Sequence, residues 1–192
     1  MRPRMVVIAG PPGSGKSTFF PVSDLGLDGF NADDRAAALN GGSYQNISLD
    51  IRARTGKEFE HFVVDHIKTK RTFAIETTLR TDITFRQAQL AREAGFQIEM
   101  VYVCAGDFDS CLHRVIARGF LGGHSAPADQ LKKIHSASLR NLPRAIREMD
   151  KLRVYDSRLG ETPSLVLEAI SGKIEFMRKP VPVWLTSALD AN

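Results

Sequence analysis

The sequence predicts an α/β domain with a mainly parallel sheet, and two observations carry this prediction. Short apolar runs alternate with helix-like stretches along the chain, as expected for strands followed by helices. The first apolar run, residues 5–9, passes directly into a glycine-rich loop. Ligands of such sheets bind beyond the carboxyl ends of the strands, so we expect the polar residues that follow each strand to form the site.

Each element has its own local signal. We expect strands at 5–9, near Phe30, at 73–76 and at 96–104, and helices beginning near Gly15 and covering 35–39, 46–70, 82–95, 108–119 and 128–149. Pro21 should end the first helix early. Asp33 or Asp34 can cap the second helix, and Asp82 and Gly95 should bound the helix between them.

The glycine-rich loop contains a complete phosphate-binding pattern. Gly10, Gly15, Lys16 and Ser17 match G-x-x-x-x-G-K-[ST], and the loop lies between a strand and a helix. Glycines let backbone N–H groups surround a phosphate, the lysine reaches the β- and γ-phosphates, and the Ser17 hydroxyl is a ligand for Mg²⁺. An ordinary turn is the alternative. We expect a three-layer sandwich of the P-loop NTPase type, with nucleotide-binding residues Gly10, Pro11, Pro12, Gly13, Ser14, Gly15, Lys16, Ser17 and Thr18.

Composition narrows the class of protein. The 192 residues carry a net charge of +4 and no repeat, which suits one domain over 1–192 and makes nucleic acid an improbable partner. No apolar run reaches the roughly 20 residues that span a bilayer, and the N-terminal run is too short for a signal peptide, so we expect a cytoplasmic protein. Cys104 and Cys111 lack metal-ligand spacing and should be free thiols.

Polar residues at the expected strand ends form a set that phosphoryl transfer requires. Asp33 follows the second apolar segment, residues 76–78 read ETT at the end of the next strand, and Arg114 and Arg118 lie one helical turn apart. A carboxylate can accept the proton of an acceptor hydroxyl, hydroxyls can hold the acceptor, and an arginine can neutralise the moving phosphoryl group. Each residue also has an ordinary interpretation, as a helix cap, an ion-pair partner or a solvated cation.

The ordered motifs resemble those of the zeta-toxin-like P-loop kinases over most of the chain. They are GPPGSGKST, FNADD, FAIETTLR, RVIARGFLGGHSAP, SLRNLPRAI and VYDS. The resemblance implies an ATP-dependent kinase whose best-known members phosphorylate a sugar hydroxyl of UDP-N-acetylglucosamine. By motif, Asp33 would be the base on that hydroxyl, Glu76 and Thr78 would hold the acceptor with help from Arg80, and Arg118 would be a lid arginine on the triphosphate.

The resemblance also implies a helical lid, at about residues 114–135. Arg114 and Arg118 would contact ATP from it. Relatives typically read GGHDVP before an arginine-rich helix start, whereas this chain has Ser125 and Ala126 in GGHSAP. A second lid arginine is therefore missing, and Lys133 is the nearest substitute; a lysine cannot make the bidentate contact of an arginine.

Other functions stay open at this stage. The acceptor could be a different sugar nucleotide, a nucleoside or an RNA end. A nucleotide-dependent switch or ATPase would usually show a hydrophobic strand ending in aspartate, and the nearest imitation, VYVCAGD, displaces Asp107 from the strand end. A domain that binds ATP without catalysis is disfavoured because the lysine, serine, aspartate and arginine named above are all present. An antitoxin partner is possible for such a family but does not follow from this sequence.

Overall fold

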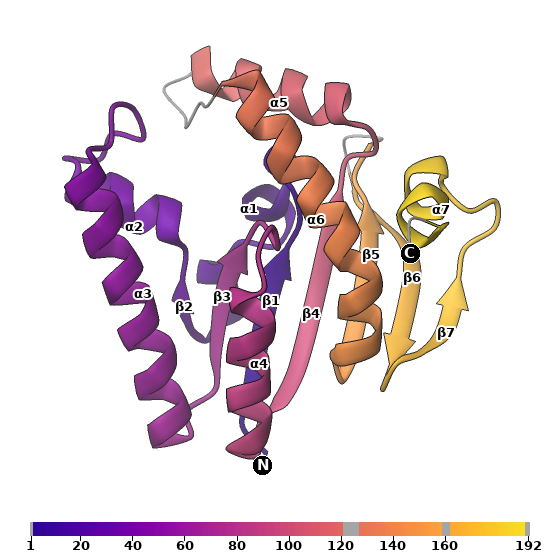
Figure 1. The fold of residues 1–192 in the computed structure, drawn as a ribbon, viewed down its shortest axis with the longest axis horizontal. Helices are drawn as coiled ribbons and strands as arrows, with labels where there is room; N and C mark the ends of the chain where they lie inside the picture. The colour runs from indigo at the N-terminus through magenta and orange to yellow at the C-terminus, as the bar shows by residue number, and fades with distance from the viewer. Residues whose placement is uncertain (1, 121–126, 159–161, 191–192) are drawn as a thin grey trace.

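A seven-stranded sheet in the order β2-β3-β1-β4-β5-β6-β7 forms the centre of the computed structural model (Figure 1). The structure describes residues 2–120, 127–158 and 162–190. The strands are β1 (Arg4–Ala9), β2 (Asp28–Phe30), β3 (Phe73–Thr77), β4 (Gln97–Cys104), β5 (Lys151–Asp156), β6 (Ser164–Ile170) and β7 (Lys173–Met177). β1 to β5 pair in parallel, and β6 and β7 are antiparallel. The mainly parallel α/β sheet expected from the sequence is confirmed.

The helices cover the two faces of this sheet unequally. They are α1 (Lys16–Phe19), α2 (Ala32–Leu39), α3 (Leu49–Thr69), α4 (Ile83–Glu93), α5 (Phe108–Phe120), α6 (Ala128–Glu148) and α7 (Val183–Asp190), with a 3-10 turn η1 (Val22–Leu25). Apolar residues of α3, α4, α6 and α7 form the main core against one face, the near side in Figure 1. A smaller cluster joins the other face of β1 and β3 to Val22 of η1. Helices on both faces give the three layers of the expected sandwich.

Most helix boundaries agree with their local signals, but two expectations about capping side chains fail. Asp82 lies at the N-cap position of α4 as expected, yet its side chain makes no capping hydrogen bond. α1 ends at Phe19, just before Pro21, as expected. The cap of α2 is neither Asp33 nor Asp34, because the Asn31 side chain accepts the N–H groups of both residues. Asn31 lies immediately before the helix in extended conformation, which is the position from which a short polar side chain can reach these two donors.

The C-terminal part of the sheet was less predictable. β7 lies at the outer edge of the sheet, and four of its five residues are exposed. Its sequence KIEFM alternates polar and apolar residues over only four positions, which is a weak signal for a strand. Trp184 and Leu185 of α7 are buried against the main core. None of the helices in the described ranges has the length and apolarity that crossing a membrane requires.

The strand register brings the expected site residues to one edge of the sheet. Ala9, the last residue of β1, is opposite Thr77 of β3 and Tyr102 of β4. The phosphate-binding loop therefore begins beside the ETT segment. Figure 1 shows α5 crossing above this edge, over the start of α1.

Candidate active site

The phosphate-binding loop is pressed against its neighbours, and this explains two of its glycines. Gly10 and Gly13 have φ angles of 140° and 78°. A Cβ atom at Gly10 would lie 2.0 Å from the carbonyl oxygen of Val103, and one at Gly13 would lie 2.2 Å from that of Cys111. These two positions therefore require glycine because the loop packs closely on β4 and α5, in addition to any need for space around a phosphate.

Backbone donors in this loop are free to bind an anion. The N–H of Ser14 donates to the carbonyl of Pro11. The N–H groups of Gly13, Gly15, Lys16 and Ser17 donate to no protein acceptor within the described ranges. Unsatisfied donors at the start of a helix, next to a buried cation, are the arrangement that binds phosphate. The residues present thus fit a nucleotide phosphate.

Lys16 is the cation of the loop and is almost completely buried. Its Nζ donates to the carbonyl oxygens of Gly10 and Pro11 at 2.9 and 3.1 Å. Burial lowers the pKa of Lys16, while the carboxylates of Glu76 and Asp33 act in the opposite direction and raise it. The ammonium group therefore lies within the field of two acids and is held on the loop that it serves.

Glu76 connects the end of β3 to the phosphate-binding loop. The Ser17 hydroxyl lies 3.0 and 3.1 Å from its two carboxylate oxygens, and Asn31 Nδ2 donates to one of them at 3.2 Å. Burial raises the pKa of Glu76, against the charge of Lys16 and the hydrogen bond from Ser17, which lower it. A hydroxyl and a carboxylate side by side are oxygen ligands of the kind that Mg²⁺ prefers.

Asp33 lies in the first turn of α2 with its side chain exposed. Because Asn31 caps the helix, the Asp33 carboxylate is not used for capping: it is the Asp33 N–H that donates to Asn31 Oδ1, at 2.9 Å. The Asp33 charge acts on both Lys16 and Glu76. The structure thus brings Lys16, Ser17, Glu76 and Asp33 together.

The two arginines that were expected to belong to a lid have different surroundings. Arg114 donates to the Ser157 hydroxyl at 3.2 Å and to the Ser157 carbonyl at 2.6 Å. Ser157 in turn donates to the Ser14 carbonyl at 2.6 Å, so Arg114 supports the phosphate-binding loop through the end of β5. Arg118 is exposed in the last turn of α5, and its charge adds to the lowering of the Lys16 pKa that burial causes. No hydrogen bond or ion pair joins the Arg118 side chain to another residue within the described ranges.

The remaining predicted residues are less closely tied to the loop. Thr78 is half-buried and Arg80 is exposed, and both follow Glu76 in the segment after β3. Lys133 is exposed on α6, and no contact within the described ranges joins it to the phosphate-binding loop. Ser125 and Ala126 of the expected lid lie outside the described residues.

A comparison with models of protein families identifies the family of this chain. The family model described as an AAA domain matches residues 5–138, more than half of the chain. The chain belongs to this AAA-domain family. The range that matches the AAA-domain model contains the phosphate-binding loop, Asp33, Glu76 and both arginines of α5. No curated protein matches the sequence.

Solved structures share the fold at low sequence identity. A structure of the PezAT chromosomal toxin-antitoxin system of Streptococcus pneumoniae has a TM-score of 0.68 and 19% identity, covering 100% of this chain and 80% of that one. A putative kinase from Chloroflexus aurantiacus has a TM-score of 0.55 and 20% identity, covering 71% and 80%. The AvrRxo1-ORF1:-ORF2 complex with ATP has a TM-score of 0.68 and 16% identity, and the match covers 91% of this chain and 60% of that one. The resemblance of this AAA-domain chain to the zeta-toxin-like P-loop kinases is confirmed.

Three contacts of the AAA-domain site were not predicted from the sequence. Asn31 caps α2 and binds Glu76, Ser157 bonds the phosphate-binding loop, and Asp156 pairs with Arg158 and accepts the Trp184 indole N–H at 3.3 Å. The Asn31 cap and the Asp156–Arg158 pair are local, whereas the contacts of Asn31 with Glu76, of Ser157 with the loop and of Asp156 with Trp184 join segments far apart in the chain, so no local pattern reveals these three. The motifs NADD and VYDS contain three of these residues and are the only signal available beforehand.

The half-buried carboxylate of Glu76 leads to a prediction about the pH dependence of stability. A folded-state pKa above the unfolded value favours folding at low pH, and that contribution is lost as pH rises through the folded pKa. Glu76→Gln removes the ionising group. Without nucleotide or metal, we expect its Tm to exceed that of the wild type by roughly 2–4 °C at pH 8, with the difference shrinking toward pH 4.

Thermal unfolding of both proteins between pH 4 and 8 measures this difference. Glu60→Gln is the matched control, since Glu60 is exposed on α3 and its replacement should leave Tm nearly unchanged. A Glu76→Gln protein that is less stable than the wild type at pH 8 would mean that the Ser17 and Asn31 contacts outweigh the cost of burial.

Proposed function

We propose that this protein is an ATP-dependent kinase that transfers the γ-phosphoryl group of ATP to a hydroxyl of a small molecule. The observation that carries the proposal is the continuous chain of contacts from the phosphate-binding loop to α2. Ser17 bonds Glu76, Glu76 bonds Asn31, and Asn31 holds the turn that presents Asp33. An exposed carboxylate is thereby held on the turn next to the proposed phosphate site.

Asp33 is the general base in this proposal. Its carboxylate accepts the proton of the acceptor hydroxyl as that oxygen attacks the γ-phosphorus, and the bond from phosphorus to the β–γ bridging oxygen breaks to release ADP. Lys16 and the free N–H groups of the loop hold the phosphates in line. The Asp33 side chain suits this part because Asn31 has taken over the capping of α2.

Magnesium fits the same site. Ser17 and Glu76 would hold Mg²⁺ together with phosphate oxygens and water, and the bound ion would neutralise charge on the transferring group. Glu76 was expected to hold the acceptor, and its contact with the Ser17 hydroxyl adds a part in metal binding to that expectation. Thr78 and Arg80, on the same segment, remain the proposed acceptor ligands.

UDP-N-acetylglucosamine is the first acceptor to test. This choice rests on the resemblance to zeta-toxin-like kinases, and a different sugar nucleotide, a nucleoside and an RNA end are the next candidates. The experiment incubates the protein with ATP, Mg²⁺ and each acceptor, and follows ADP by chromatography and added phosphate by mass spectrometry. ADP that forms only with an acceptor supports a kinase, whereas ADP release without any acceptor would identify an ATPase or switch. If phosphate is added to a different hydroxyl compound and not to UDP-N-acetylglucosamine, the proposed substrate is wrong and the proposed kinase activity stands.

Arg118 of α5 provides a test of the proposed lid at 114–135. Arg118 is exposed in the last turn of α5, the helix that crosses above the start of α1, and we propose that its guanidinium contacts the triphosphate (Figure 1). Because this charge is needed most in the transition state, we expect Arg118→Ala to lower kcat about 10²–10³-fold while weakening ATP binding only slightly. Lys133→Ala should cost much less, since its charge is a single point on an exposed helix face.

Steady-state kinetics on the two alanine variants test this ranking. Lys132→Ala, the exposed neighbour on α6, is the matched control for Lys133. A kcat near the wild-type value for Arg118→Ala would show that Arg118 does not act on the triphosphate. A larger loss of kcat in Lys133→Ala than in Arg118→Ala would give the proposed lid role to Lys133.

A further inference from the structure

The segment after β3 holds a residue in an unfavourable conformation. Leu79 has φ = 56°, in the left-handed region, and its side chain is completely buried. For a residue with a Cβ atom this region is unfavourable, because Cβ comes too close to the following carbonyl oxygen. Such backbone strain persists only where the surroundings fix it. Leu79 lies between Thr78 and Arg80, the two proposed acceptor ligands, so whatever fixes Leu79 also orients them.

Both backbone polar groups of Leu79 are held from outside the residue. Its N–H donates to Thr77 Oγ1 at 3.1 Å, and the Thr84 hydroxyl of α4 bonds that same oxygen at 3.3 Å. Its carbonyl accepts the Nδ2–H of Asn141 at 2.8 Å, from a residue 62 positions away on α6. Asn141 is thus the long-range contact that closes this segment.

The helix that carries Asn141 is itself fixed to the sheet. Ser138, one turn earlier, is fully buried and its hydroxyl lies 3.0 Å from the Tyr102 hydroxyl of β4. Leu142 is also completely buried in the main core. These neighbours set the rotation of α6, so the Asn141 amide points from a rigid element toward the Leu79 carbonyl. The motif SLRN in the sequence combines the anchor and the donor.

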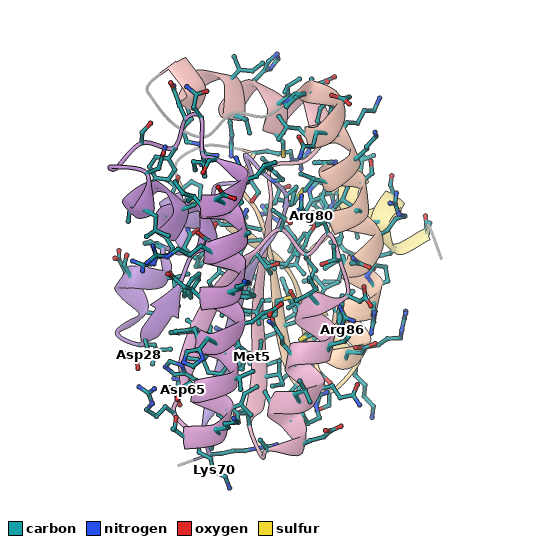
Figure 2. All side chains as sticks on the ribbon, turned by 60° about the vertical axis from the view of Figure 1, so that its left-hand side comes forward. Met5, Asp28, Asp65, Lys70, Arg80 and Arg86 are labelled. Atoms are coloured by element: carbon teal, nitrogen blue, oxygen red, sulfur yellow. The ribbon has the colours of Figure 1, made fainter. Side chains whose placement is uncertain are left out.

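We infer that Asn141 is a positioning residue for acceptor binding, acting through the Leu79 carbonyl to hold Thr78 and Arg80 in place. This inference rests on the proposed function for its kinetic consequence but not for its structural one. Within the described ranges the side chains of Thr78 and Arg80 bond no other residue, so only the backbone of this segment sets their direction. Figure 2 shows Arg80 well separated from Lys70, which lies near the other end of the molecule.

Trypsin digestion tests the structural consequence without any acceptor. Arg80 and Lys70 are both exposed cleavage sites, and Lys70 serves as the internal reference. Loss of a buried hydrogen bond to an otherwise unsatisfied carbonyl should release the segment, so Asn141→Ala and Asn141→Asp should be cut after Arg80 about 5- to 30-fold faster than the wild type. Cleavage after Lys70, followed by mass spectrometry, should be unchanged.

Ser138→Ala is the matched control on the same helix. It removes the hydrogen bond to Tyr102 and keeps the Asn141 donor, so a loosening of α6 alone would raise cleavage after Arg80 in Ser138→Ala as much as in the Asn141 variants, and that result would also overturn the inference. An unchanged rate after Arg80 in both Asn141 variants, or an equal rise at both sites, would overturn the inference. Asn141→Asp is informative because it keeps the side-chain size and loses the donor.

The kinetic consequence is a selective loss of acceptor affinity. With UDP-N-acetylglucosamine as the probe, the Asn141 variants should show an acceptor KM raised about 5- to 30-fold and an ATP KM changed less than about twofold. An ATP KM that rises as much as the acceptor KM would contradict the inference. If the wild type does not phosphorylate this probe, the proposed substrate fails, and the trypsin result decides the inference about Asn141 separately.

Discussion

Replacing Lys16 with alanine is expected to reduce phosphoryl transfer by about 10³-fold or more. Phosphoryl transfer depends on positioning and on charge stabilisation, and losing one preorganised donor elsewhere costs about 10²–10³-fold. Lys16 combines both parts, because its ammonium is buried in the loop and bonds the Gly10 and Pro11 carbonyls. It should therefore organise the loop as well as neutralise the phosphates.

Turnover and folding must be measured together for this variant. Burial already lowers the pKa of Lys16, so removing the cation should not unfold the protein, and thermal unfolding checks this. Lys68→Ala, an exposed lysine in the last turn of α3, is the matched control and should keep wild-type turnover. Wild-type turnover in Lys16→Ala would remove the phosphate-binding assignment of the loop.

The sequence predicted the parts of the fold that depend on local signals. The strand–loop–helix at the N-terminus, the early end of α1 before Pro21 and the end of α4 before Gly95 all follow from residue types within a few positions. No strand was predicted at β7, although its sequence KIEFM begins by alternating polar and apolar residues; the run is only five residues long and four of them are exposed. Local chemistry was sufficient where an element is buried or has a clear start or stop signal.

The candidate site was predictable to the same extent. The topology of a parallel sheet gathers strand ends, so Glu76 was expected at the same edge of the sheet as the phosphate-binding loop, whereas its contact with Ser17 was not predicted. The supporting contacts could not be predicted, because Ser157 and Asn141 reach the site from 143 and 62 residues away in the chain. The capping role of Asn31 was missed for a different reason. The aspartates that follow it, Asp33 and Asp34, are residue types that cap helices equally well, and only the backbone geometry shows which of the three side chains caps α2.

Asp33→Asn is expected to fold and to bind ATP like the wild type, yet to lose most of its phosphoryl transfer. Removing a general base costs about 10²–10⁴-fold in turnover. The structure makes asparagine a clean probe, because the Asp33 side chain takes no part in capping α2. The backbone N–H that donates to Asn31 is unaffected by the change, so the helix should keep its start.

Asp34→Asn is the control that distinguishes proton transfer by the Asp33 carboxylate from a general effect of negative charge at the start of α2. Asp34 is the next residue, shares the same cap, and accepts the Tyr44 hydroxyl at 2.8 Å, so its neutralisation changes the same local charge without touching the proposed base. Both variants lose one negative charge near the N-terminus of α2, worth about 0.3–1 kcal/mol of stability. If turnover falls equally in the two, the acids act through the field of the helix, and Asp33 is not the base. A loss confined to Asp33→Asn, with unchanged ATP binding, assigns the proton transfer to that carboxylate.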